Sequence, residues 1–258
     1  MVEQPTAASD VLFTKRDLVE GRILKRYKRF LADVELASGE MVVAHCTNTG
    51  TMASCWKSGD TVLLEPNDSP RRKLKYTWIA CERCGTWVGV ETGMPNRVVA
   101  EAARRDCLPG LPGLHDVKTE VRYGNERSRI DVLAQDGAGR SVYIEVKNTT
   151  LRTESDAGPV VSFPDAVTAR GLKHLRELQA MVGEGHRAAI VFFVHRDDVQ
   201  CFGPAREIDP AYADELDRAA AAGVEILPLQ SRIEGARRPD GTWTLSWRLD
   251  GLLPWCRS

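Results

Sequence analysis

Three ionisable residues on two predicted strands have the types and spacing of a metal-dependent hydrolytic site. Asp131 lies in the run 128–133, whereas Glu145 and Lys147 alternate within the run 143–147. Because side chains of a strand point alternately to its two faces, Glu145 and Lys147 share a face. Two carboxylates can hold a divalent cation, and an ammonium can orient water or neutralise charge on a phosphoryl group. The pattern predicts phosphoryl-transfer chemistry, with Mg²⁺ or Mn²⁺ bound by Asp131 and Glu145.

Turn lengths predict that the acids of this site oppose one another. A hairpin that closes around Ala138 places Asp131 directly opposite Glu145, and a four-residue loop over 124–127 places Glu120 opposite Asp131. Like charges in such a row destabilise a sheet, and a divalent cation removes that penalty. The alternative interpretation is a set of solvated charges on an exposed sheet face. A register shifted by one residue would also separate the acids.

A helix predicted over 168–182 follows these strands. Its leucines at 172, 175 and 178 form a buried stripe, and Arg170 and His174 lie on other faces of the helix. Alone, the segment indicates an ordinary amphipathic helix with a charged outer side. Beside a metal site, Arg170 and His174 become candidate phosphate contacts.

The remaining pattern divides the chain into four parts. Residues 1–17 are polar and without period, which predicts a flexible leader, and short turn-separated strands over 18–93 predict a small β-barrel. A mixed α/β domain is predicted over 94–233, and residues 234–258 form an extension with no assigned structure. In the second domain we expect a first helix that Asn96 caps and that the loop at 109–113 ends, and helices at about 168–182 and 210–222, the last capped by Asp209. Strands are expected at 117–123, 128–134, 141–147, 188–194 and 224–229.

Composition excludes several classes of protein. The 258 residues carry 35 Lys plus Arg and 36 Asp plus Glu, so only local basic patches could attract a nucleic acid. No run approaches the roughly 18 apolar residues of a membrane helix, which predicts a protein without a membrane partner. The seven cysteines are scattered and odd in number, so we expect reduced thiols and a cytoplasmic location.

Two basic patches with interleaved aromatic residues are candidate nucleic-acid contacts, since lysine and arginine neutralise phosphates and aromatic rings stack on bases. The alternative is a solvated face above core aromatics. The candidate residues are Lys25, Arg26, Tyr27, Lys28 and Arg29 in the first patch and Arg71, Arg72 and Lys73 in the second.

Cys81 and Cys84 have the spacing of half a zinc site. A structural zinc needs four ligands, and no second pair follows at a usual distance. Zinc at this pair is therefore not favoured.

The sequence resembles the sugar fermentation stimulation protein A family over about residues 18–232. The motifs that carry the resemblance are long and occur in the same order along the chain. They are the runs 26–34, 48–52, 123–131, 143–148, 163–168, 170–175 and 223–227.

The resemblance implies an N-terminal OB-like barrel followed by a PD-(D/E)xK nuclease-like domain, a divalent metal and DNA or RNA as partner. By that resemblance Asp131 matches the acidic residue of the motif, and Glu145 and Lys147 match its ExK element. Glu101, on the first helix, and Glu120 compete for the role of a further acid. Two functions stay open: a metal-dependent nuclease, and a non-catalytic DNA-binding regulator of sugar-utilisation genes that keeps the nuclease scaffold.

Overall fold

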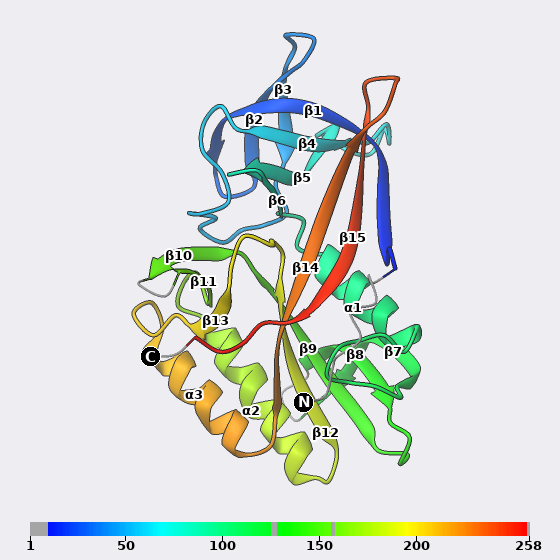
Figure 1. Ribbon diagram of the computed structural model, residues 1–258, viewed down its shortest axis with the longest axis vertical. Helices are drawn as coiled ribbons and strands as arrows, with labels where there is room; N and C mark the ends of the chain where they lie inside the picture. Colours follow the sequence, from blue (N-terminus) through cyan, green and yellow to red (C-terminus); the bar gives the residue numbers. More distant parts are fainter. Residues whose placement is uncertain (1–9, 125–127, 156–157, 257–258) are drawn as a thin grey trace.

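The computed structural model describes residues 10–124, 128–155 and 158–256. Its first strands form the upper, barrel-like part of Figure 1, and the lower part is a sheet flanked by helices. The barrel strands are β1 (Phe13–Tyr27), β2 (Leu31–Leu36), β3 (Met41–His45), β4 (Thr61–Pro66), β5 (Tyr76–Arg83) and β6 (Thr86–Gly89).

The second part begins with helix α1 and is built around a mixed sheet. Its elements are α1 (Met94–Arg104), β7 (His115–Tyr123), β8 (Ser128–Gln135), β9 (Ser141–Thr149), β10 (Leu151–Ser155), β11 (Gly158–Phe163), α2 (Ala169–Gly183), β12 (Arg187–Val194), β13 (Cys201–Pro204), α3 (Pro210–Ala221), β14 (Glu225–Arg237) and β15 (Trp243–Leu252). The fold is thus a mixed α/β fold, as predicted. No helix among the described residues is both long and apolar enough to span a membrane.

One continuous hydrogen-bonded path connects the two parts. The strand order is β2-β3-β5-β4-β1-β15-β14-β12-β9-β8-β7, and β10, β11 and β13 form a separate small sheet. Strand β12 is parallel to both β9 and β14, and its run 188–194 is buried throughout. A central strand covered on both faces needs no polar alternation, which explains its uninterrupted apolar sequence.

The two faces of the sheet pack against different helices. Val142, Ile144 and Val146 of β9 belong to the hydrophobic cluster under α1. Tyr143, from the same strand, packs in the cluster under α2 and α3. Glu145 and Lys147 lie on the same side of β9 as Tyr143 and therefore face α2.

Two of the three helices in the described part of the chain begin at a side-chain cap. Thr168 accepts a hydrogen bond from Gly171 N at the start of α2, and the predicted cap Asp209 accepts one from Tyr212 N at the start of α3. The expected cap of the first helix was wrong. Gly93 occupies the cap position of α1 without a side-chain bond, and Asn96 lies inside the helix, where its side chain is free for a tertiary contact.

The predictions for the chain ends were also wrong in part. Strand β1 begins inside the expected leader, because Phe13 pairs with Trp247 of β15. Strands β14 and β15 likewise occupy most of the expected extension and run side by side from the lower sheet up to the barrel (Figure 1). Residues 1–9 lie outside the described part, and the division into 18–93 and 94–233 stays a prediction.

The expectation that all cysteines are reduced was wrong as well. Cys201 and Cys256 form a disulfide with a Cα–Cα distance of 5.0 Å, across a sequence separation of 55 residues. An isolated β-bridge pairs Phe202 with Trp255, and it brings the neighbouring sulfur atoms of Cys201 and Cys256 together. Sequence spacing could not predict this pair, because the tail after β15 approaches β13 only in the folded chain.

His195 lies where the barrel meets the sheet and is fully buried. Trp247 Nε1 donates to its Nε2 at 2.8 Å, and its Nδ1 lies 3.1 Å from Asn148 Oδ1. Tryptophan can only donate, so Nε2 is the acceptor and the proton is on Nδ1. Burial lowers the pKa of His195 from 6.5 to about 3, and the ring is neutral in the folded protein.

We expect acid to destabilise the protein through His195. The folded pKa lies below the unfolded value, so the unfolded state binds the extra proton and the stabilisation is complete only above pH 6.5. It declines by up to about 1.4 kcal/mol per pH unit as the pH falls toward 3. Urea unfolding at pH 7, 6 and 5 measures this loss. His195→Gln should be less stable at pH 7 but show a smaller slope between pH 6.5 and 5, and equal slopes would contradict the assignment.

Candidate active site

The predicted acids meet at the point where strands β8 and β9 separate. The ladder between these strands pairs Val132 with Ile144 and Leu133 with Tyr143, which is the register expected from the turn length. Asp131 and Glu145 occupy the next opposed positions, just beyond the last ladder pair. The hairpin thus brings the two carboxylates together as the sequence predicted.

Glu120 also lies where the turn length predicted it. The pairs Thr119 with Val132 and Val121 with Ile130 flank Glu120 on one strand and Asp131 on the other. Glu120 has a φ of 57°, a left-handed conformation that interrupts the regular ladder at this point. Both residues line the same cavity, and the charge of Glu120 adds to the raised pKa of Asp131.

The side chain of Asp131 accepts a backbone hydrogen bond from β9 just beyond the end of the ladder between β8 and β9. The alternation of β8 breaks at this residue, since Ile130 packs under α2 while Val132 packs under α1. Asp131 Oδ2 accepts from the backbone N of Val146 at 2.7 Å, and Oδ1 accepts from Asn96 Nδ2 at 2.7 Å. The carboxylate is thereby fixed between β9 and α1.

Burial raises the pKa of Asp131 from 3.8 to about 6, and the negative charge of Glu145 adds to the rise. The hydrogen bond from Val146 and the charge of Lys147 oppose it but do not cancel it. Keeping both acids ionised therefore costs free energy in the metal-free protein.

Glu145 is held by two nitrogen groups of different elements. Lys147 Nζ donates to its Oε1 at 2.6 Å, and His174 Nδ1 of α2 makes a short contact with the same oxygen. Burial is the largest single influence and raises the pKa of Glu145, but the hydrogen bond from His174 and the charge of Lys147 outweigh it, so the pKa is lowered overall. Oε2 of the same carboxylate is buried and has no hydrogen-bond partner among the residues that the structure describes.

His174 is buried, whereas a phosphate contact is expected to be exposed. The side chain is 5% exposed, with Nδ1 3.2 Å from Lys147 Nζ. Arg170 Nε lies one helical turn away, 3.4 Å from His174 Nε2. A buried imidazole in this position orients Glu145 and Lys147, whereas the exposed Arg170 is open to a ligand.

A cavity of about 400 Å³ opens in front of the acids on the side of α2. Arg129, next to Asp131 on the cavity wall, is a basic residue that the sequence analysis did not select. The cavity is lined by Glu120, Ser128, Arg129, Asp131, Arg170, Lys173 and His174. Basic groups thus surround the mouth of an acidic centre.

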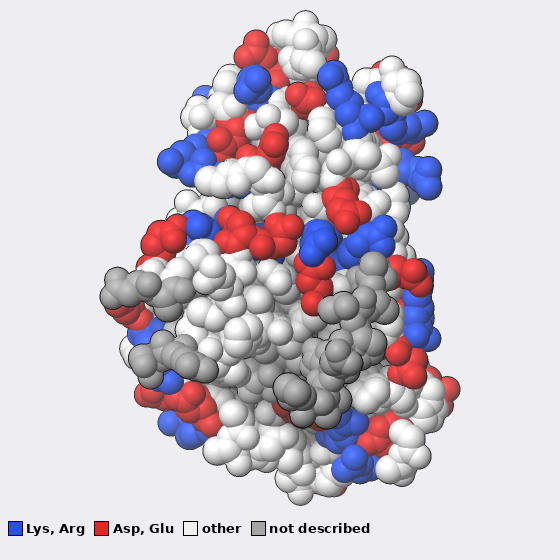
Figure 2. Space-filling model, viewed as in Figure 1, with Lys and Arg blue, Asp and Glu red and all other residues white. Residues whose placement is uncertain are grey.

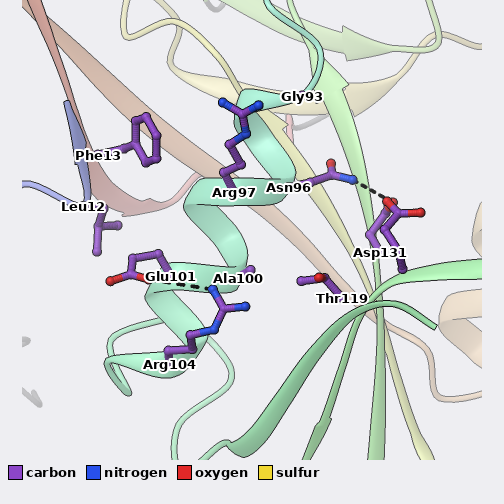
Figure 3. Close-up of a pocket in the computed structure, with 11 residues that line it drawn as sticks. Leu12, Phe13, Gly93, Asn96, Arg97, Ala100, Glu101, Arg104, Thr119 and Asp131 are labelled. Atoms are coloured by element: carbon purple, nitrogen blue, oxygen red, sulfur yellow. Dashed lines mark hydrogen bonds and ion pairs between the residues drawn. The ribbon is translucent and has the colours of Figure 1, made fainter. Parts of the chain in front are cut away.

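A second cavity, of about 630 Å³, approaches Asp131 from the side of α1. Figure 3 shows Asn96 reaching from α1 to Asp131, while Leu12 and Phe13 of the β1 region line the opposite side. Glu101 lines this cavity but pairs with Arg105 at 2.7 Å on its own helix. Asn96, and not Glu101, is therefore the α1 residue that contacts Asp131.

The first basic patch of the barrel is largely engaged in internal contacts. Arg26 donates to the backbone oxygens of Asn48 and Gly50 at 2.8 and 2.9 Å. Lys25 pairs with Asp33, to which Tyr27 also donates, and Arg29 donates to Thr49 O. Lys28 is exposed. These contacts fix Arg26 and Arg29 against the barrel loops, and Lys25 is the basic residue of the patch with an acidic partner in the described part of the chain.

The second patch is more accessible. Arg71, Arg72 and Lys73 are exposed, although Arg72 also donates to Thr77 Oγ1. Figure 2 shows basic and acidic side chains interspersed on the face in view, without a broad area of either sign. No residue of either barrel patch lines one of the two cavities at Asp131.

Cys81 and Cys84 differ in their surroundings. Cys81 is buried in the barrel, whereas Cys84 is exposed in the turn before β6. Burial raises the pKa of the Cys81 thiol far above its usual range. The pair does not present two thiolates to a common ligand.

Family models match most of the chain. Residues 24–90 match the SfsA N-terminal OB domain, and residues 93–237 match the sugar fermentation stimulation protein RE domain. The chain belongs to the sugar fermentation stimulation protein family. The resemblance seen in the sequence is confirmed, and so are the OB-like barrel and the nuclease-like second part.

Curated members of the sugar fermentation stimulation family support this placement. The homolog of Geotalea uraniireducens is 48% identical over 216 residues, covering 84% of this chain and 91% of that protein. The homolog of Rhodospirillum rubrum is 47% identical over 233 residues, covering 88% and 94%. The structure of Pyrococcus furiosus SfsA in complex with Ca²⁺ aligns with a TM-score of 0.81 and 27% identity, covering 96% of this chain and 99% of that one.

Proposed function

We propose that this member of the sugar fermentation stimulation family is a divalent-metal-dependent phosphodiesterase that acts on nucleic acid. One observation carries the proposal: Asp131 and Glu145 are held together at the strand junction, with Lys147 bonded to one of them. Juxtaposed buried acids raise the free energy of the folded chain, so a site that keeps them has a use for their charge.

The residues fit a divalent cation of the Mg²⁺ or Mn²⁺ type. Glu145 Oε2 is a buried oxygen without a partner in the described part of the chain, and the charge of Glu145 contributes to the raised pKa of Asp131. Among the described residues no three His, Cys, Asp or Glu side chains form a complete metal cluster. Mg²⁺ usually keeps several waters and uses one or two carboxylates plus phosphate oxygens, so Asp131 and Glu145 suffice as protein ligands.

The other side chains have separate tasks. The cation supplies charge stabilisation and a more acidic water. Lys147 retains hydrogens that can be donated to a phosphate oxygen or to the attacking water, and Glu145 keeps its ammonium in place. Arg129 and Arg170 lie at the mouth, where each can bind a phosphate through two parallel hydrogen bonds.

The Ca²⁺ complex of the archaeal relative supports a cation site in this family. Calcium and magnesium share a preference for oxygen ligands, although they differ in size and coordination number. We infer that this chain uses Asp131 and Glu145 for the same class of ion.

A second candidate is a nucleic-acid-binding regulator without catalysis, acting on DNA at sugar-utilisation genes. The hydrogen bonds of the acids favour it, since both oxygens of Asp131 and one oxygen of Glu145 have partners within the protein. The two candidates differ in whether a bound strand is cut.

Removing the metal distinguishes a nuclease from a regulator that only binds nucleic acid. We expect the protein to cleave labelled DNA or RNA in Mg²⁺ or Mn²⁺ and to lose that activity entirely in EDTA, with recovery when the metal is restored. Single and double strands of both kinds are tested, and binding is followed alongside by fluorescence anisotropy. Binding without cleavage under every condition would favour the regulator.

A further inference from the structure

Two arginines face each other at the outer end of the β7–β8 hairpin. Arg122 pairs directly with Arg129 across the ladder, and both are exposed. Like charges directly opposite one another destabilise a sheet. Within the described residues neither arginine has an ion pair or side-chain hydrogen bond that would offset the repulsion.

The arginine pair lies next to the acidic pair. Arg122 and Arg129 are each two residues from Glu120 and Asp131, respectively, a spacing of about 7 Å along a strand. Arg129 lines the same cavity as Asp131. Arg122 and Arg129 also line an adjoining hollow of about 620 Å³. One hairpin therefore carries a pair of acids followed by a pair of bases.

A polynucleotide bound with a divalent cation would satisfy both pairs. The cation neutralises the acids, and the phosphate backbone supplies negative charge beside them, at one charge per roughly 3.4 Å of axis for each strand of a duplex. A strand with one phosphate at the acids must place another near the arginines. A small phosphoester has no second phosphate at that distance.

We propose that Arg122 and Arg129 bind the phosphate next to the scissile one, which makes a polynucleotide the substrate of this site. The inference rests on the proposed function and adds the two residues that bind the neighbouring phosphate and so favour a polynucleotide over a small phosphoester.

The test compares Arg122→Gln, Arg129→Gln and the double variant with wild type. Arg237→Gln is the matched control, an exposed arginine in β14, outside both cavities. Binding of labelled 20-nucleotide DNA and RNA is measured in Ca²⁺ between about 50 and 200 mM salt. Cleavage in Mn²⁺ is compared with hydrolysis of the small diester bis(p-nitrophenyl) phosphate.

We expect each single variant to weaken binding about tenfold and to lower the slope of log affinity against log salt by about 0.7 to 0.9 for each lost phosphate contact. The ratio of oligonucleotide to small-diester hydrolysis should fall by a similar factor. The melting temperature should stay level or rise, because a repulsive pair has been removed, whereas a merely structural arginine would lower it when replaced.

Wild-type affinity and salt slope in the double variant, with wild type still binding and cutting the oligonucleotide, would overturn the arginine site and leave the proposed function intact. A wild-type protein that binds no nucleic acid in any metal would overturn both.

Discussion

Asp131→Asn is expected to abolish metal-dependent cleavage while making the metal-free protein more stable. The substitution removes one of the two carboxylates proposed to hold the cation. A bound metal contributes several kcal/mol of charge stabilisation, so its loss should slow cleavage about a thousandfold or more. The fold should be retained, because an asparagine oxygen can still accept from Val146 N and the Asn96 amide can rotate to face its new partner.

The gain in stability follows from the raised pKa of Asp131. The folded pKa of about 6 exceeds the usual 3.8, so the folded state binds more protons than the unfolded state between these values. Stability therefore falls as the pH rises through this interval, and above pH 6 the whole penalty is present. At pH 7, Asp131→Asn should raise the free energy of unfolding by about 1–2 kcal/mol, after a discount for partial exposure.

Urea unfolding with and without Mg²⁺ measures the stability of each variant and its response to the metal, and a cleavage assay is run beside it. Mg²⁺ should stabilise wild type and leave Asp131→Asn unchanged. Asp116→Asn, at an exposed acid near the start of β7, is the control and should alter neither cleavage nor the response to metal. Cleavage by Asp131→Asn at the wild-type rate would refute the metal role. A loss of stability at pH 7 would refute the electrostatic argument.

Lys147→Met is the second change with a large expected effect. Removing the ammonium takes away a donor to the water or phosphate, which should reduce the cleavage rate about 10²- to 10⁴-fold. It also leaves Glu145 buried with His174 as its remaining charge-stabilising partner, so the pKa of Glu145 should rise. Breaking a buried ion pair from one side costs about 3–5 kcal/mol, and this variant should be less stable than wild type without metal.

A divalent cation can replace part of the lost charge. We therefore expect Mg²⁺ to stabilise Lys147→Met more than wild type, because the metal then neutralises a carboxylate that has lost its lysine. Lys75→Met, at an exposed barrel lysine, serves as the matched control. Wild-type cleavage by Lys147→Met, or a loss of metal binding equal to that of Asp131→Asn, would assign Lys147 a purely structural role.

Local signals account for what was correctly predicted. The turn over 136–139 set the register that opposes Asp131 to Glu145, and the hairpin before it placed Glu120 in the row. The helix α3 followed from Asp209 and Pro210, because capping and proline preferences act within one turn. These features depend on residues close together in the chain.

Contacts between distant segments could not be predicted in this way. The pairing of β1 with β15 orders residues near both chain ends, although neither segment has a strong strand pattern of its own. The bond between Cys201 and Cys256 depends on the same return of the chain. Only the folded chain shows that Arg26 donates hydrogen bonds to the backbone of the loop after β3.

The amino-acid sequence by itself determined the family, the two-part architecture and the strands that carry Asp131, Glu145 and Lys147. The tertiary structure decided their partners: Asn96 from α1 for Asp131 and His174 from α2 for Glu145. The physical reason is the distance along the chain over which each kind of interaction acts. Periodicity, turn length and capping act over a few residues, whereas partners on opposite faces of the sheet are chosen by the packing of whole helices against it.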